Sequence, residues 1–197
     1  MVWRPVGRRF LNQHARHGAP ARDHVAVPRA TAAPGSRSQR QITLPPLSTK
    51  SPFLDEDLTA AESRAVPPTW TLTAHHRPMF DSDPQEGSNL TVRAAWHAIM
   101  QKHHVDLDFN GHAHHYESTL PIGGDGGVVD AGGIRFITAG GAGALFDSPD
   151  ATPNPWTLVY YVGLSFAVVD VAGRTLTLQG RRLDGTSIET SPIVLTK

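Results

Sequence analysis

The chain has 197 residues, of which 39% are apolar, as is ordinary for a globular protein with one hydrophobic core. No run reaches the roughly 18 apolar residues of a membrane span. The first ten residues lack the apolar stretch of a signal peptide, so we expect neither feature. Cysteine is absent, which excludes disulfides, thiolate metal ligands and cysteine nucleophiles.

The zero net charge conceals two unlike segments. Residues 1–50 carry nine Lys or Arg against one acid, with six prolines, whereas residues 51–197 carry nine basic and seventeen acidic side chains. The first segment has no helical or strand periodicity, so we expect residues 1–50 to be a disordered basic leader and residues 51–197 to fold. A basic tail that binds nucleic acid is the alternative interpretation, and a solvated tail is favoured over it.

Two helices and two strands are predicted in the first part of the folded segment. Helix formers over 54–64 end at a Val-Pro-Pro sequence, and a short strand over 70–74 follows. Ser88 is a plausible N-cap for an amphipathic helix over 89–103. An alternating strand over 105–109 then runs into an Asn-Gly turn.

Strands and turns dominate the rest of the chain. A strand over 134–138 leads into a glycine-rich loop, and the strands 164–171 and 175–179 are separated by Ala-Gly, which predicts a hairpin. A last strand is expected near 187–195. The order strand, helix, strand and then a series of strands predicts an α/β layered architecture.

Eight of the eleven histidines lie between residues 75 and 115. His112 and His114 are separated by one small residue, so in extended backbone their side chains leave on the same side. Two convergent imidazoles suit Zn, Fe or Mn. A polar loop that happens to be rich in histidine is the alternative, but the preceding glycine turn and apolar strand favour a metal site.

Two segments resemble motifs of a known family. Val-Asp-Leu-Asp-Phe-Asn-Gly-His-Ala-His-His-Tyr-Glu over 105–117 is similar to the last motif of calcineurin-like metallophosphoesterases, and closest to their purple acid phosphatase branch. Trp-Thr-Leu-Thr-Ala-His-His-Arg-Pro over 70–78 resembles the preceding motif, a strand that ends in His-x-Pro. The resemblance covers roughly residues 52–197. It implies the C-terminal half of a layered β-sandwich flanked by helices, with the N-terminal half missing.

The resemblance also implies a site and a reaction. His76 and His112 match the ligands of one metal and His114 matches a ligand of the other, with His112 also catalytic. The family uses two ions, Fe with Zn, Mn or Fe, to hydrolyse small-molecule phosphate monoesters as an acid phosphatase, and many members are secreted. Glu117 matches a position from which a carboxylate can hold an imidazole N–H.

Several family features are missing from the sequence. The family's Asp-x-His, Gly-Asp-x-x-Asp (or -Tyr) and Gly-Asn-His motifs, which contribute the other ligands, do not occur, and Ser118 replaces an arginine. Three imidazoles fall short of two coordination shells, so we expect one weakly bound ion and impaired hydrolysis. The alternative is a non-catalytic metal-binding or interaction module of the same fold. Sheet edges left uncovered would favour self-association.

Overall fold

A computed structural model describes residues 47–149 and 151–197. The predicted leader over 1–50 therefore lies outside the described residues, apart from 47–50, which belong to the first helix. That helix begins at Leu47, earlier than the predicted start near residue 54. Within the described residues, no helix is long and apolar enough to cross a membrane.

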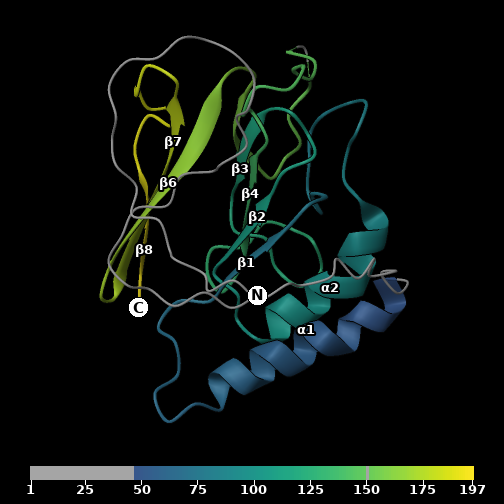
Figure 1. Ribbon diagram of the computed structural model, residues 1–197, viewed down its shortest axis with the longest axis vertical. Coiled ribbons are helices and arrows are strands. Elements are labelled where there is room, and N and C mark those ends of the chain that lie inside the picture. The colour runs from purple at the N-terminus through teal and green to yellow at the C-terminus, as the bar shows by residue number, and fades with distance from the viewer. Residues whose placement is uncertain (1–46, 150) are drawn as a thin grey trace, which may run out of the picture.

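The described residues form three layers, two helices, a five-stranded sheet and a three-stranded sheet (Figure 1). The elements of the first two layers are α1 (Leu47–Glu62), α2 (Leu90–Lys102), β1 (Leu72–His75), β2 (Leu107–Asn110), β3 (Tyr116–Thr119), β4 (Arg135–Ala139) and β5 (Thr157–Tyr161). The second sheet contains β6 (Ser165–Ala172), β7 (Thr175–Arg182) and β8 (Ile193–Thr196). The predicted α/β layered class is confirmed.

The larger sheet is mixed, with the order β1-β2-β4-β3-β5. Strands β1, β2 and β4 are parallel, and β3 pairs antiparallel with β4 and β5. The smaller sheet is antiparallel throughout. The predicted hairpin joins β6 to β7, and Gly173 supplies its turn at φ +58°, in the left-handed region that glycine tolerates.

Apolar side chains form one core on each face of the five-stranded sheet. Consecutive residues of a strand point to opposite faces, and on β4 Phe136 joins the core under the helices while Ile137 joins the core between the sheets. This double burial explains the apolar Ile-x-Phe-Ile run of this segment. Both residues are almost wholly inaccessible to solvent.

Helix α2 begins one residue later than predicted. Its N-cap is Asn89, whose side-chain oxygen accepts a hydrogen bond from the Val92 amide at 3.0 Å. Ser88, the predicted N-cap, instead accepts a hydrogen bond from the Asp81 amide through its hydroxyl oxygen. The hydrogen bond between Asp81 and Ser88 joins two parts of the loop between β1 and α2.

The parallel pairing of β1 with β2 places the histidine segments together. Their last paired residues are His75 and Asn110, so the loops that follow leave from the same edge of the sheet. The Gly111 amide donates to the His76 carbonyl oxygen at 3.1 Å, which holds the two loops side by side.

Candidate metal centre

His76 and His112 meet at the carboxyl ends of β1 and β2. Nε2 of His76 lies 3.0 Å from Nδ1 of His112, and the two ring centroids are 4.8 Å apart. Partial burial, followed by the positive charges of His112 and Arg77, lowers the pKa of His76. His76 therefore favours the neutral imidazole that binds metals.

The backbone of His112 is in an unusual conformation. Its φ is +66°, in the left-handed region that residues other than glycine rarely adopt. Such conformations cost about 1–3 kcal/mol and concentrate at functional sites. The neighbouring Ala113 amide donates to the Gly111 carbonyl oxygen at 2.8 Å, which closes a tight turn around His112.

His114, the third predicted ligand, faces a different group. Its Nδ1 lies 2.7 Å from the carbonyl oxygen of Leu145, and its amide donates to the Asp147 carboxylate. Its charge still contributes to lowering the pKa of His76. The structure thus pairs His76 with His112 and turns the Nδ1 of His114 toward the loop after β4.

Glu86 is a neighbour that the sequence did not reveal. Its Oε2 lies 2.8 Å from Nε2 of His112. The loop that carries Glu86 is shaped by Asp83, whose Oδ1 accepts from the amides of Gln85 and Glu86, both at 2.8 Å. No motif marks Glu86, because only the folded loop brings it to His112 across 26 residues of sequence.

The pair His76 and His112 fits a shared metal ion. Two ligand atoms that each lie about 2.0–2.2 Å from one ion are roughly 3.0–3.5 Å apart when the ligand–metal–ligand angle lies between the octahedral and the tetrahedral value. The observed 3.0 Å between their nitrogens falls at the lower end of this spacing, and it is also the length of a hydrogen bond between the two rings. Glu86 contacts Nε2 of His112 and is placed to accept the ring proton on that nitrogen. The lone pair of Nδ1 then remains directed at His76.

A second group of titratable side chains lies in the interior. Nε2 of His115 is 3.6 Å from Oδ2 of Asp81 and 3.5 Å from Oε2 of Glu117. Its Nδ1 is 2.9 Å from Oδ2 of Asp147. Burial raises the pKa of Asp81 to about 6. Burial alone would lower the pKa of His115, but the surrounding carboxylates outweigh it and raise that pKa.

The remaining histidines near the site have structural partners. His75, the neighbour of His76, contacts the buried carboxylate of Asp108 at 2.9 Å. His97 packs in the core beside Phe80, with ring centroids 5.2 Å apart. His103 is buried against Asp55 at 2.7 Å. These contacts give His75, His97 and His103 structural partners outside the predicted metal set.

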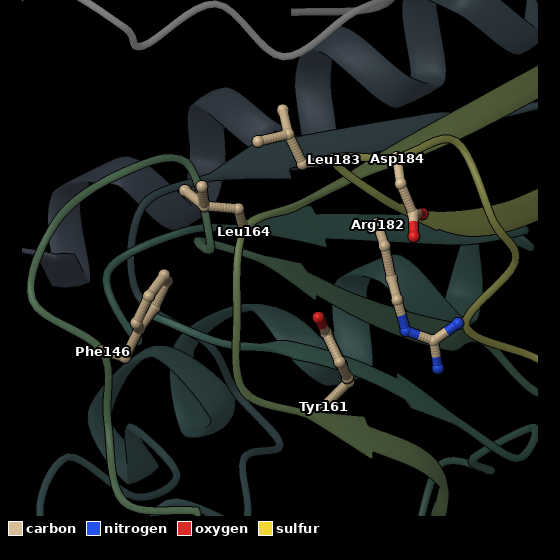
Figure 2. Close-up of a pocket in the computed structure, with 6 residues that line it drawn as sticks. All are labelled: Phe146, Tyr161, Leu164, Arg182, Leu183 and Asp184. Carbon is tan, nitrogen blue, oxygen red and sulfur yellow. The ribbon is translucent and has the colours of Figure 1, made fainter.

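A pocket of 630 Å³ is lined in part by the loop after β4, whose Leu145 contacts His114. Figure 2 shows the apolar side chains at one side and the charged ones at the other, and the lining consists of Phe146, Tyr161, Leu164, Arg182, Leu183 and Asp184. Phe146 directly follows Leu145, whose carbonyl contacts His114. One loop thus contributes to both the histidine site and the pocket.

Comparisons with curated proteins identify acid phosphatases. The chain is 33% identical over 79 residues to an acid phosphatase of Aspergillus ficuum, covering 40% of this chain and 12% of that protein. It is 29% identical over 128 residues to the acid phosphatase type 7 of Mus musculus, covering 54% of this chain and 29% of that protein. The chain spans less than a third of the length of these relatives. No family model matches it.

Solved structures show the same fold. A purple acid phosphatase from yellow lupin (Lupinus luteus) seeds superposes with a TM-score of 0.65 at 21% identity, covering 81% of this chain and 29% of that chain. GAP50, the anchor in the inner membrane complex of Plasmodium, superposes with a TM-score of 0.60 at 17% identity, covering 76% of this chain and 43% of that chain. The chain therefore resembles, in sequence and in fold, the C-terminal part of a purple acid phosphatase-like metallophosphoesterase.

Proposed function

We propose that this chain supplies part of the metal centre of a metal-dependent phosphomonoesterase, with His76, His112 and His114 as metal ligands. The observation that carries the proposal is the 3.0 Å approach of His76 to His112 at the carboxyl ends of two parallel strands. The acid phosphatases among its relatives support a small-molecule phosphate ester as substrate.

The residues of this chain have distinct tasks in that centre. His76 and His112 present lone pairs to one ion, and Glu86 holds His112 in the required tautomer by accepting its other ring proton. Bound ions of the family type, Fe with Zn, Mn or Fe, supply Lewis-acid stabilisation of the phosphate charge. His114 joins the centre when its ring leaves the Leu145 carbonyl oxygen.

Hydrolysis by this chain alone should be slow. Two cations held close together repel each other, and the described residues place a single carboxylate, Glu86, in contact with the histidine pair. Within the described part of the chain, the ion-pair partner of the Glu86 carboxylate is His112. We therefore propose one weakly bound ion and low turnover.

A non-catalytic metal-binding or interaction module is the second candidate. It is favoured by the contact of His114 with Leu145, because this contact occupies Nδ1 of His114 and the three predicted ligands do not converge on one point. GAP50, one of the proteins with this fold, is described as an anchor. In this candidate the histidines bind an ion that holds the loops after β1 and β2 and performs no chemistry.

Turnover of an aryl phosphate tests the proposal. The purified chain is assayed with Zn²⁺, Mn²⁺ or Fe²⁺ beside the variants His112→Ala and His104→Asn. His104 is an exposed histidine with φ +49°, a conformation that Asn tolerates, so it is a matched control. We expect weak metal-dependent turnover that His112→Ala abolishes and His104→Asn retains. Equal turnover in His112→Ala would contradict the proposal, and metal binding without turnover would favour the second candidate.

A further inference from the structure

Asp81, His115 and Glu117 form a buried cluster that the proposed function does not use. Asp81 lies in the loop after β1, His115 precedes β3, and Glu117 is on β3. The side chains of Asp81 and His115 have no solvent exposure, and that of Glu117 has 1%. One ligand atom from each lies within 4.8 Å of the other two.

The distances in this cluster exceed those of hydrogen bonds. Nε2 of His115 is 3.6 Å from Asp81 and 3.5 Å from Glu117, whereas N–H···O bonds are about 2.7–3.2 Å long. Two ligands on one tetrahedral ion with bonds near 2.1 Å are about 3.4 Å apart. The observed spacing therefore matches two ligands of one ion better than a donor and its acceptor.

Two of the inner atoms of the cluster lie at ion-pair distance from each other but have no hydrogen-bond partner. Within the described part of the chain, neither Nε2 of His115 nor Oδ2 of Asp81 makes a hydrogen bond, although both are buried. A buried polar atom without a partner costs about 1–3 kcal/mol. Two buried atoms of this kind that lie close to each other indicate a site for one ion bound by both.

The outer atoms of the same side chains are held in place. Nδ1 of His115 lies 2.9 Å from Asp147, and a neutral imidazole that donates its proton there has its Nε2 lone pair available for an ion. Glu117 accepts hydrogen bonds from the Ser82 amide and hydroxyl, both at 2.8 Å, and from Thr157 at 2.6 Å. This pattern of oriented ligands is typical of metal sites.

The cluster holds more carboxylates than basic side chains, and this excess favours a bound cation. Asp81, Glu117 and Asp147 surround one imidazole, and the buried Asp83 adds a fourth carboxylate next to Asp81. Burial, followed by the charges of these four acids, raises the pKa of the Tyr160 hydroxyl, whose ring packs 4.4 Å from that of His115. Buried negative charge in excess is costly unless a positive charge offsets it.

We propose that Asp81, His115 and Glu117 bind one divalent transition-metal ion of the Zn²⁺ type in a structural site, separate from the His76–His112 pair. The ion ties the loop after β1 to β3. One imidazole and two carboxylates suit Zn²⁺. The inference does not depend on the proposed phosphatase function, because no residue of this cluster belongs to the predicted catalytic set.

The test measures Zn²⁺ retention and unfolding temperature in the full chain. Protein stripped with a chelator is loaded with ZnCl₂ and desalted, and bound zinc is measured by elemental analysis. The variants are Asp81→Asn, which keeps the side-chain size, and the triple variant His76→Ala/His112→Ala/His114→Ala. Glu189→Gln is the matched control, because Glu189 is a buried carboxylate in the other core.

The wild type, the triple variant and Glu189→Gln should each retain about one tightly bound zinc per chain. Zinc at about 100-fold above its Kd should raise their unfolding temperatures by roughly 5–10 °C. Asp81→Asn should lose both the retained zinc and the shift. Zinc retention in Asp81→Asn equal to that of the wild type, or its loss in the triple variant instead, would overturn the proposal. If Asp81→Asn does not fold, retention by His115→Gln decides in the same way.

Discussion

Gly140 packs against the loop that carries His112 and His114, and replacing it with alanine should disturb the candidate metal site. A Cβ at residue 140 would lie 1.9 Å from the carbonyl oxygen of Ala113 and 2.9 Å from its carbonyl carbon. Both are backbone atoms, so no side-chain rotation relieves the contact. The Gly140 amide also donates to the His115 carbonyl oxygen at 3.0 Å, which ties the same two segments together.

The cost of Gly140→Ala follows from this contact. Forced overpacking of a close-packed region costs about 1–3 kcal/mol. For a chain of this size, each kcal/mol lowers the unfolding temperature by about 2–4 °C, so we expect a fall of roughly 2–12 °C. Ala113 lies between His112 and His114, so its displacement should also weaken zinc binding at the histidine site.

Circular dichroism during heating and calorimetric titration with Zn²⁺ measure the two effects. Gly124→Ala is the matched control, because a Cβ there meets only the side chain of Gln101, at an ordinary 3.5 Å. The control should keep the wild-type unfolding temperature and zinc affinity. If Gly140→Ala equals Gly124→Ala in both measurements, the close approach of the two loops does not position the site.

Three further predictions concern single side chains. Glu86→Gln should weaken zinc binding at the histidine site about 10–100-fold in a calorimetric titration, since the carboxylate orients His112. Tyr116→Phe removes the hydroxyl that donates to the buried Glu189 and should cost about 1–3 kcal/mol in urea unfolding; an unchanged midpoint would contradict this. Burial lowers the pKa of His97 below 6.5, so the unfolded chain binds the proton more readily and stability falls as pH drops below about 6.5, by at most about 1.4 kcal/mol per pH unit. His97→Leu should flatten that fall between pH 7 and pH 5, and an unaltered pH dependence would count against it.

The regular parts of the fold could be predicted because periodicity reports burial. Helix α2 and strands β1, β2 and β4 lie within a few residues of the predicted ranges. The meeting of the segments that carry His76 and His112 also follows from two strands that end at the same sheet edge. The family resemblance was carried by these same segments, and the comparisons confirm it.

Other features depend on contacts that a linear pattern does not encode. Strand β5 was not predicted, because its Thr-Leu-Val-Tyr-Tyr sequence does not alternate in polarity and its side chains are mostly half-buried. Glu86, Asp81 and Asp147 lie in irregular loops, and they reach histidines 26–34 residues away only in the folded chain. The left-handed backbone of His112 likewise carries no sequence signal.

The ligands of the histidine site can be observed directly from ring-nitrogen resonances. Long-range ¹H–¹⁵N correlation spectra of the full chain, recorded during Zn²⁺ titration, report each imidazole separately. The ring-nitrogen resonances of His76, His112 and His114 should shift at a common zinc concentration, while those of His97, buried beside Phe80, should stay fixed. Zinc uptake with the resonances of His76 and His112 unchanged would contradict the assignment of the metal centre to the loops after β1 and β2.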